Sequence, residues 1–369
     1  MLVLGYMSGT SLDGVDAALI DTDGERIAEV DAATLIPFAT AERRVIEAAT
    51  RDALMWNGLG DRPASFASAG AVVTDAHVRA GEQVIAEAGR RPELIGFHGQ
   101  TVLHRPERRL SVQIGDPQVL ADALGIPVVA RLRQHDLAAG GQGAPLVPIY
   151  HAALAERLRR KSGLELPVAF LNVGGVANLT WIGRDGRLIA FDTGPGNGLI
   201  DLAVQARGVG RYDDGGRLAA AGTIDEERLA DLLAHPFFTV PGPKSLDRYD
   251  FPLTWSEELP LEDVAATLTA FTGASVGLAA QTLPEPPASW IVCGGGGHNP
   301  TLMAVLRSVL GDCRTADDVG LRSDFVEAEA MAFLAARHRR GLPITFPETT
   351  GVPEAMSGGT LFRPQTNTS

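Results

Sequence analysis

The chain has 369 residues, of which 45% are hydrophobic and 21% are charged, and its formal net charge is −13. This length fits two domains, each large enough to bury a core of its own. The negative charge argues against a general affinity for nucleic acids or anionic membranes, because both are polyanions.

Localisation signals are sparse. The first residues lack the basic-then-apolar pattern of a signal peptide, and we expect no apolar run long enough to cross a membrane. The chain has two cysteines, Cys293 and Cys313, without CxxC spacing. A disulfide between them is conceivable, but reduced thiols in a cytoplasmic protein are the preferred interpretation.

Residues 1–30 and 166–195 share one layout. Each segment predicts an apolar strand, a turn of Gly, Ser, Thr or Asn, a second strand, an Asp-Gly turn and a third strand. The Asp-Gly turns are Asp23-Gly24 and Asp185-Gly186. A turn of this kind directs backbone N–H groups into one space, which is how a chain binds phosphate without bulky side chains. Two such turns favour a pair of related domains that hold a nucleoside triphosphate, although two unrelated hairpins remain an alternative.

The rest of the chain alternates between helices and strands, which predicts an α/β fold with mixed sheets. Residues 136–148 are too rich in Gly and Pro for regular structure, and we expect them to form a hinge or cleft loop between the halves. Further strands are expected over 93–101, 110–116, 126–132 and 289–295. Helices are expected over 41–55, 63–88, 117–124, 150–162, from 199, 225–234, 264–283, 301–310 and 325–339.

The first turn has residues suited to phosphate. We expect Gly9, Thr10 and Ser11 to contact the β- and γ-phosphates of a nucleotide, and Asp13 to hold Mg²⁺ directly or through water. The alternative is a hairpin loop in which these side chains bond only their own backbone. The turn is not a Walker A loop, because no Gly-Lys-Ser/Thr follows it.

The second turn predicts a matching phosphate site formed by Gly174, Gly175 and Asn178. Asp192 ends a strand shortly after this turn, so it should face the same space. A carboxylate in that position is a candidate general base. The alternative is a turn aspartate that bonds the N–H of Gly194.

A third glycine-rich segment joins a predicted strand to a predicted helix. Gly294, Gly295 and Gly296, with Gly297, would leave a flat surface on which an adenine can lie. Asn299 is expected to cap the following helix, whose N-terminus would lie near the α-phosphate.

These three loops, in this order, resemble the sugar kinase/Hsp70/actin superfamily. The chain is more specifically similar to the anhydro-N-acetylmuramic acid kinase family. The matching strings cover residue 7 to about residue 353: MSGTSLDGVD, HGQTVLH, QIGDP, AAGGQGAPLVP, NVGGVANLT, FDTGPGN, CGGGGHNP and TTGVP.

The resemblance implies two related actin-like, ribonuclease-H-like lobes with mixed sheets and an interdomain cleft. We expect residues 1–135 to form the first lobe, joined by part of the C-terminal segment, and residues 136–350 to form the second. Residues 351–369 should be a loose tail. The resemblance also implies ATP and Mg²⁺ as cofactors, a cytoplasmic homodimer, and no nucleic-acid or membrane partner.

The family opens the 1,6-anhydro ring of anhydro-N-acetylmuramic acid with water and phosphorylates O6, which is a step in cell-wall recycling. By this resemblance, Gly9–Asp16 form the ATP loop, so Leu12, Gly14, Val15 and Asp16 join the residues above. Asp192 corresponds to the catalytic carboxylate. The residues expected to bind the sugar are Gln142, Asn197, Glu327 and His98.

Three departures from the family pattern lie outside the ATP loops, and the first of them could alter contacts with the sugar. The chain has Lys244-Ser245-Leu246-Asp247-Arg248 where the family commonly has Lys-Ser-Thr-Gly-Arg, and Arg131-Leu132-Arg133 where it usually has Asp-Phe-Arg. Glu329 replaces an apolar residue. Two alternatives therefore remain: a plain sugar kinase that does not open a ring, and a non-catalytic ATP-binding module of the Hsp70/actin type. The carboxylate at Asp192 argues against the second.

Overall fold

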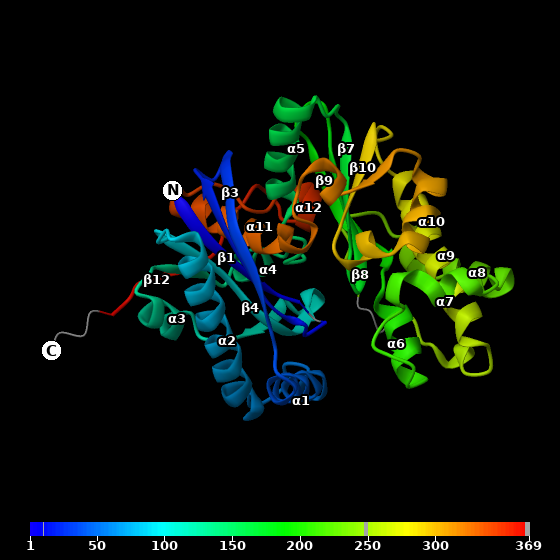
Figure 1. Ribbon diagram of the computed structural model, residues 1–369, viewed down its shortest axis with the longest axis horizontal. Coiled ribbons are helices and arrows are strands. Elements are labelled where there is room, and N and C mark those ends of the chain that lie inside the picture. The colour runs from blue at the N-terminus through cyan, green and yellow to red at the C-terminus, as the bar shows by residue number, and fades with distance from the viewer. Residues whose placement is uncertain (10, 247–249, 366–369) are drawn as a thin grey trace. The chain divides into compact units, whose positions relative to one another are not determined.

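A computed structural model describes residues 1–9, 11–246 and 250–365 of the chain. It divides into two compact units (Figure 1). Unit 1 comprises Met1–Arg157 and Phe325–Ser369, and unit 2 comprises Leu158–Asp324. The chain passes between the units within α5 (Pro148–Ser162) and just before α11 (Val326–Arg339).

These crossing points differ from the expected lobe boundaries. Residues 136–157 and 325–350, expected in the second lobe, belong to unit 1. The Gly- and Pro-rich segment 136–148 therefore lies within unit 1 and does not connect the two units. Its first residues are helical, because α4 (Gln134–Ala138) extends into it.

Unit 1 is built on one mixed sheet with the strand order β12-β6-β4-β1-β2-β3 and with β5 paired to β4. The first three strands form an antiparallel meander, whereas β4 runs parallel to β1 and β6 runs parallel to β4. The strands are β1 (Leu2–Ser8), β2 (Gly14–Thr22), β3 (Ile27–Pro37), β4 (Leu94–Arg105), β5 (Leu110–Ile114), β6 (Val128–Ala130) and β12 (Thr360–Phe362).

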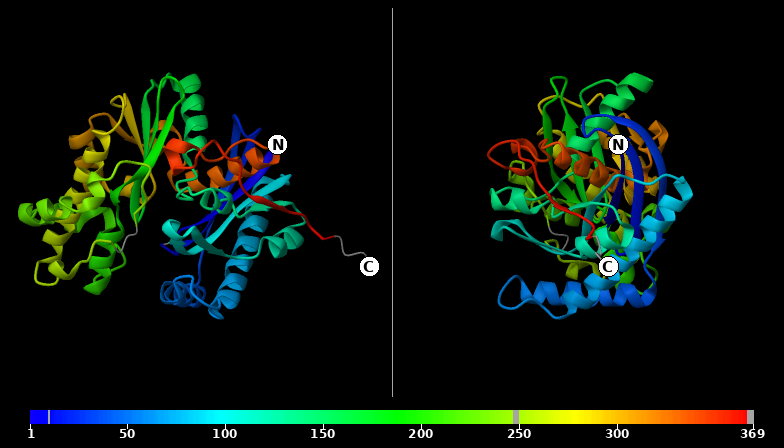
Figure 2. Two further views of the ribbon diagram at one scale, coloured as in Figure 1. Left: turned by 180° about the vertical axis from the view of Figure 1, so that it is seen from behind. Right: turned by 90° about the vertical axis from the view of Figure 1, so that its left-hand side faces the viewer.

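Helices cover both faces of this sheet (Figure 2). On one face α11 lies so close to β1 that a Cβ atom added to Gly5 would collide with the carbonyl oxygen of Ala328. On the other face Tyr6 packs against Gly81 of α2. Successive residues of a strand point to opposite faces, so this alternation fixes which side each helix covers. The remaining helices of unit 1 are α1 (Thr40–Trp56), α2 (Ser65–Ala88), α3 (Pro117–Leu124) and α12 (Pro347–Thr350).

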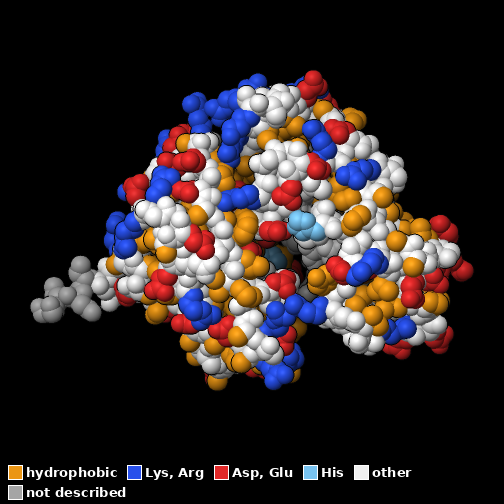
Figure 3. All heavy atoms as spheres, viewed as in Figure 1, with side chains coloured by type: hydrophobic (Ala, Val, Ile, Leu, Met, Phe, Trp, Pro, Cys, Tyr) orange, Lys and Arg blue, Asp and Glu red, His pale blue; other side chains and the backbone are white. Residues whose placement is uncertain are grey.

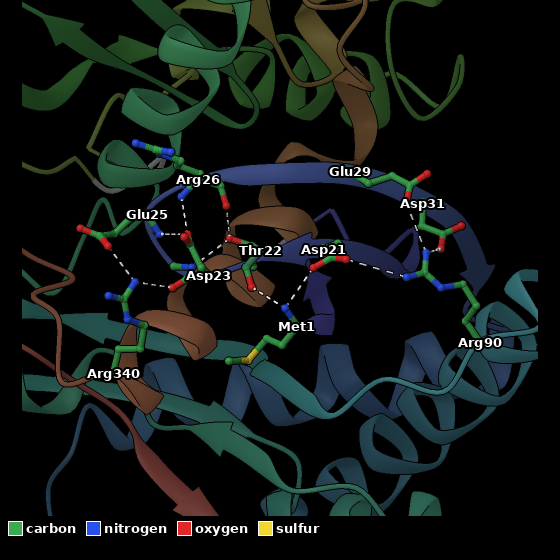
Figure 4. Close-up of polar contacts among 11 residues, drawn as sticks. Met1, Asp21, Thr22, Asp23, Glu25, Arg26, Glu29, Asp31, Arg90 and Arg340 are labelled. Carbon is green, nitrogen blue, oxygen red and sulfur yellow. Dashed lines mark hydrogen bonds and ion pairs between the residues drawn. The ribbon is translucent and has the colours of Figure 1, made fainter.

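The predicted Asp23-Gly24 turn is present and is tied to the end of α11 (Figure 4). The Asp23 carboxylate accepts hydrogen bonds from the N–H groups of Glu25 (2.8 Å) and Arg26 (2.7 Å). Gly24 has a φ of 82°, a conformation that favours glycine. Arg340 donates to the carbonyl of Asp23 (3.0 Å) and pairs with Glu25 (2.7 Å). These local bonds explain why the turn is readable from sequence.

Unit 2 repeats the strand order of unit 1. Its sheet has the order β11-β10-β7-β8-β9, with β7, β8 and β9 as the antiparallel meander and with β10 and β11 parallel to β7 and β10 respectively. The strands are β7 (Val168–Val173), β8 (Val176–Ile182), β9 (Leu188–Pro195), β10 (Ser289–Cys293) and β11 (Cys313–Thr315). The prediction of an α/β fold made of two related lobes with mixed sheets is confirmed.

The core of unit 2 is organised around α9 (Leu261–Ala280). Val276 packs into the cluster beneath the sheet, and Phe271 packs into a second cluster with α6 (Gly198–Ala206). By length and composition α9 could span a membrane, so the expectation that no segment reaches this length is wrong. However, 67% of its most apolar window is buried inside the protein, as in a core helix. The other helices are α7 (Arg217–Ala221), α8 (Glu226–Leu233) and α10 (Pro300–Leu310).

The C-terminal segment is more ordered than predicted. Val352 is buried, and β12 pairs with β6, so residues 351–365 are not a loose tail; the last four residues lie outside the described part. Cys293 and Cys313 are both buried, and no disulfide bond joins them. On the face drawn in Figure 3, acidic and basic side chains are interspersed.

Candidate active site

The first predicted phosphate turn joins β1 to β2 and is held by its own backbone. The N–H of Leu12 donates to the carbonyl of Gly9 (3.2 Å), and the N–H of Phe38 donates to that of Asp13 (3.1 Å). From β4, the side-chain amide of Gln100 donates to the same Gly9 carbonyl (3.2 Å). Ser11 and Asp13 are exposed at the tip. Thr10, also predicted to bind phosphate, lies outside the described residues.

Several residues of Gly9–Asp16 are explained by packing within unit 1. Leu12 and Val15 are buried in the core of unit 1, so only their backbones can face a ligand. A Cβ atom on Gly14 would collide with the carbonyl of Ile36 on β3, which explains the glycine by strand packing. Asp16 is half-buried on β2. Gly9 differs, because the atom nearest to an added Cβ is the Ser11 hydroxyl at 3.6 Å.

Two buried polar atoms lie at the base of this turn. Ser8 and Gln100 are neighbours on β1 and β4, and each is only 1% exposed. The Ser8 hydroxyl and the Gln100 side-chain carbonyl oxygen have no hydrogen-bond partner among the described residues. Buried polar atoms normally have a partner, and an exception calls for a reason such as a ligand, an ion or water.

The second predicted turn, at the end of β7, is fastened to the start of α6. The N–H of Asn197 donates to the carbonyl of Gly174 (2.7 Å), and the N–H groups of Gly196 and Gly198 both donate to that of Gly175 (3.1 Å each). A Cβ on Gly175 would meet no atom within 4 Å, and one on Gly174 would meet only the Val176 carbonyl at 3.8 Å. The fold does not require glycine for space at either position.

A row of polar residues crosses the sheet beside this turn. Asn172 on β7 pairs with Asn178 on β8, which in turn pairs with Asp192 on β9. Directly opposed residues on neighbouring strands point to the same face. All three are half-buried, and the side-chain oxygen of Asn178 has no partner among the described residues. The row therefore places a carboxylate and two amides on one face, next to the glycine turn.

The third predicted loop packs on the end of β7. Added Cβ atoms on Gly294 and Gly296 would come within 2.5 Å of Asn172 Oδ1 and Val173 Cβ respectively, so close packing accounts for both glycines. Gly295 is more open, since a Cβ there would meet only Asn197 Nδ2, at 3.8 Å. Asn299 is the predicted cap of α10, where its side chain accepts the N–H of Leu302 (3.0 Å).

Asp192 is held by a segment that the sequence did not associate with it. Its N–H donates to the carbonyl of Lys244 (3.0 Å), and its Oδ2 accepts the N–H of Leu246 (2.8 Å). Burial lowers the pKa of Lys244, and the Asp192 carboxylate partly opposes that shift.

A cavity of about 30 Å³ lined by Phe191 and Thr193 lies on the other face of β9. It has room for roughly two water molecules and is too small for a sugar.

In unit 1, Arg133 connects residues that were predicted to bind the sugar. Its Nε donates to Nε2 of His98 (2.9 Å), and its Nη1 donates to the carbonyl of Gly143 (2.6 Å), next to Gln142. The Nδ1 of His98 bonds the carbonyl of Gly99 (2.7 Å). Burial, helped by Arg133, lowers the pKa of His98 to about 3, so the ring is neutral at pH 7. Both nitrogens of His98 are thus engaged within the protein.

Glu327 lies in the first turn of α11, close enough to Arg133 to feel its charge. Burial raises the pKa of Glu327, and the guanidinium of Arg133 offsets only part of that rise. Arg133 thus bonds His98 and the residue after Gln142, and it lies close enough to Glu327 to lower its pKa. Sequence reasoning noted Arg133 only as part of a departure. Its place just after β6 is the available signal, because ligands bind beyond the carboxyl ends of parallel strands.

Asp136 shapes the loop that carries Gln142. Its Oδ1 accepts the N–H of Gly143 (2.6 Å), and its Oδ2 accepts the hydroxyl of Thr350 on α12 (2.5 Å). The N–H of Gln142 donates to the carbonyl of Thr350 (2.7 Å). Asp136 is 3% exposed, which is consistent with a residue that organises a loop.

The predicted residues thus form two groups in unit 1 and one group in unit 2. In unit 1 these are the first turn and the residues around Arg133. In unit 2 they are Asp192, its neighbour Asn178 on β8, and the residues that follow β7, β9 and β10, namely Gly174, Gly175, Asn197, Gly294, Gly295, Gly296 and Asn299.

The sequence profile of a family described as anhydro-N-acetylmuramic acid kinase matches residues 1–364. This chain belongs to the anhydro-N-acetylmuramic acid kinase family. Curated relatives with that name occur in Phenylobacterium zucineum (50% identical, covering 99% of this chain and 100% of the relative) and Caulobacter vibrioides (50%, 98% and 98%). A third is from Bradyrhizobium diazoefficiens (47%, 99% and 100%).

A solved structure, component A of the (R)-2-hydroxyglutaryl-CoA dehydratase of Acidaminococcus fermentans, is 13% identical with a TM-score of 0.46. It covers 91% of this chain and 98% of its own. A similarity this weak supports no conclusion, so the fold assignment rests on the strand order.

The structure also shows the surroundings of the departures at Glu329 and Leu246. Glu329, in place of an apolar residue, is buried and accepts a hydrogen bond from the Tyr150 hydroxyl (2.5 Å). Leu246, in place of threonine, contributes its backbone N–H to Asp192. Asp247 and Arg248 lie outside the described residues.

Proposed function

We propose that this chain phosphorylates O6 of 1,6-anhydro-N-acetylmuramic acid with ATP while water opens the anhydro ring, giving N-acetylmuramic acid 6-phosphate for cell-wall recycling. The observation that carries this proposal is the match to the anhydro-N-acetylmuramic acid kinase family over residues 1–364. We assign residues to each step from the geometry of the two units.

Asp192 acts as the general base in this proposal. It takes a proton from a water molecule, whose oxygen attacks C1 of the sugar as the C1–O6 bond breaks. O6 then bonds to the γ-phosphorus, the bond to the bridging oxygen breaks, and ADP leaves. An inverting glycosidase needs an acid for its leaving oxygen, but here the phosphoryl group takes up O6, so one carboxylate suffices. The bonds from Leu246 and to Lys244 support this assignment, because they fix the orientation of Asp192.

The glycine turns bind the phosphates of ATP in this proposal. Gly9, Gly174, Gly175 and Gly295 are the predicted positions at which an added Cβ would meet no atom closer than 3.6 Å, so a ligand can approach their backbone. Their N–H groups would donate hydrogen bonds to phosphate oxygens, as in other phosphate-binding loops. Asn178 lies beside Asp192, and we assign it to the same reaction space.

The residues of the first turn fit a Mg²⁺ ion that arrives with ATP. Mg²⁺ keeps several waters and usually takes one or two protein carboxylates together with phosphate oxygens. The described residues contain no group of three or more metal-binding side chains, whereas Asp13 offers an exposed carboxylate. The buried oxygens of Ser8 and Gln100 add acceptors at the base of the turn. When bound, the ion neutralises charge on the β- and γ-phosphates.

In this proposal, Arg133 positions the residues of unit 1 that bind the sugar. We assign Gln142 and Glu327 to direct contact with the sugar and His98 to holding Arg133, because both His98 nitrogens are already engaged. Asn197, at the start of α6, is the sugar candidate in unit 2. A homodimer, a cytoplasmic location and the absence of nucleic-acid or membrane partners stay predictions.

Mass spectrometry of the product tests the proposal. With ATP, Mg²⁺ and the anhydro sugar, the product should equal the sugar plus one phosphoryl group plus one water. A product that gains the phosphoryl group without water would instead indicate a plain sugar kinase. ATP binding with no change in the sugar would indicate a non-catalytic module.

A further inference from the structure

The side chain of Lys244 is confined on several sides in unit 2. Its Nζ donates to the carbonyl of Phe237 (2.8 Å) and lies 4.2 Å from the centroid of the Phe237 ring. It also lies 5.9 Å from the centroid of the Phe191 ring. An ammonium within about 6 Å of an aromatic face is attracted to it. These contacts compensate a half-buried charge for part of its lost hydration.

The backbone of Lys244 and of Leu246 holds Asp192 through two hydrogen bonds. Asp192 lies on β9, the edge strand of its sheet, where one row of backbone groups has no neighbouring strand. The segment Lys244–Leu246 covers this edge, since the Lys244 carbonyl accepts the N–H of Asp192 and the Leu246 N–H donates to its carboxylate. One bond fixes the backbone of Asp192 and the other fixes the carboxylate.

We propose that Lys244 is a positioning residue, a role that rests on the proposed function of Asp192 as the base. The confined side chain of Lys244 anchors the segment Lys244–Leu246, and this segment orients the Asp192 carboxylate for catalysis. Lys244 is only two residues from Leu246, so a displacement of Lys244 also moves the Leu246 N–H that bonds Asp192. A general base must lie within hydrogen-bond reach of the proton that it removes, so a small rotation of its carboxylate costs rate.

The same geometry explains why leucine is acceptable at position 246. The hydrogen bond to Asp192 comes from the backbone, which leucine supplies as well as threonine. The Leu246 side chain packs against the apolar cluster that includes Phe251 and Phe271. The replacement of threonine by leucine therefore keeps the hydrogen bond to Asp192.

The chain offers a matched control, because it contains just two lysines, Lys161 and Lys244. Lys161 is exposed near the end of α5. Lys244→Met keeps an unbranched stem and removes the charge and the donor. Lys244→Arg keeps both and can stack on the same rings. We would measure kcat and KM for ATP and for the anhydro sugar in these variants, in Lys161→Met, in Asp192→Asn and in Asp192→Asn/Lys244→Met.

We expect Lys244→Met to lower kcat by about 10²-fold, the cost of a misplacement of roughly 1 Å, with the KM for ATP nearly unchanged. Lys244→Arg should restore most of kcat, and Lys161→Met should match the wild type. Adding Lys244→Met to Asp192→Asn should cause little further loss, because residues that act through one another are not additive.

Two results obtained with Lys244→Met would overturn the positioning role alone, provided that Asp192→Asn remains slow. One is wild-type kcat in Lys244→Met. The other is the same loss from Lys244→Met in the presence and absence of the Asp192 carboxylate. A folded but equally impaired Lys244→Arg would also contradict it, which keeps the test valid if Lys244→Met does not fold. Full turnover in Asp192→Asn would instead remove the proposed base.

Discussion

Replacing Asp136 with alanine should destabilise unit 1, because a buried carboxylate there satisfies two donors. Asp136 is 3% exposed and accepts the N–H of Gly143 and the hydroxyl of Thr350. A hydrogen bond to a charged group contributes about 1.5–3 kcal/mol, so losing both costs about 3–6 kcal/mol. In a unit of about 200 residues, each kcal/mol lowers the Tm by roughly 2–4 °C.

Two further variants separate the geometry of this site from its charge. Asp136→Asn can still accept the N–H of Gly143, and its NH₂ group can donate to the Thr350 hydroxyl oxygen, which is an acceptor as well as a donor. It should therefore lose only about 1 kcal/mol. Thr350→Val removes one of the two bonds and should lie between the two aspartate variants. Thermal unfolding followed by circular dichroism measures all three.

The same variants should affect sugar binding in the same order. The Gly143 carbonyl holds Arg133 (2.6 Å), which connects the residues expected to bind the sugar. Loosening the loop should raise the KM for the sugar and leave the KM for ATP nearly unchanged. A Tm for Asp136→Ala within about 2 °C of the wild type, or an Asp136→Asn as unstable as Asp136→Ala, would refute this reasoning.

Three further predictions test other parts of the site. Asp192→Asn should lower kcat by about 10²–10⁴-fold with little effect on the KM for the sugar, as for a positioned general base; normal turnover would contradict the assignment. Gly9→Val and Gly174→Val should fold but lose the stabilisation that ATP confers, about 2.7 kcal/mol at a hundred times Kd; an unchanged ATP-induced rise in Tm would count against the phosphate turns. Burial raises the pKa of Glu327, so the folded state binds this proton more tightly and stability falls as pH rises through the raised value. Glu327→Gln cannot ionise, so its Tm relative to the wild type should increase from pH 4 to pH 8, and a constant difference would contradict the burial argument.

Local signals in the sequence were sufficient for most elements of the fold. The Asp-Gly turn at residues 23–24 and the Asn299 cap of α10 both depend on groups within a few residues of one another. The repeated layout of residues 1–30 and 166–195 predicted a pair of related domains, and the structure has two sheets that share one strand order.

Features that depend on distant partners were missed. The pairing of β12 with β6 joins residues more than two hundred positions apart, so a segment without periodicity looked like a loose tail. The contact of Lys244–Leu246 with Asp192 and the bond between Arg133 and His98 likewise join separate elements. Several glycines predicted to bind ATP are also explained by packing, as Gly14, Gly294 and Gly296 show. Composition cannot distinguish these two reasons for a glycine.

Ring opening coupled to phosphorylation is the central claim, and the fate of the water oxygen tests it most directly. The reaction would be run in ¹⁸O-water, and the position of the label in the product would be read by fragmentation in the mass spectrometer. If water attacks C1 and O6 accepts the phosphoryl group, one ¹⁸O should appear on C1 and none on the transferred phosphate. Label on the phosphate, or a phosphorylated sugar without ¹⁸O at C1 when product is analysed before exchange with solvent, would contradict the account.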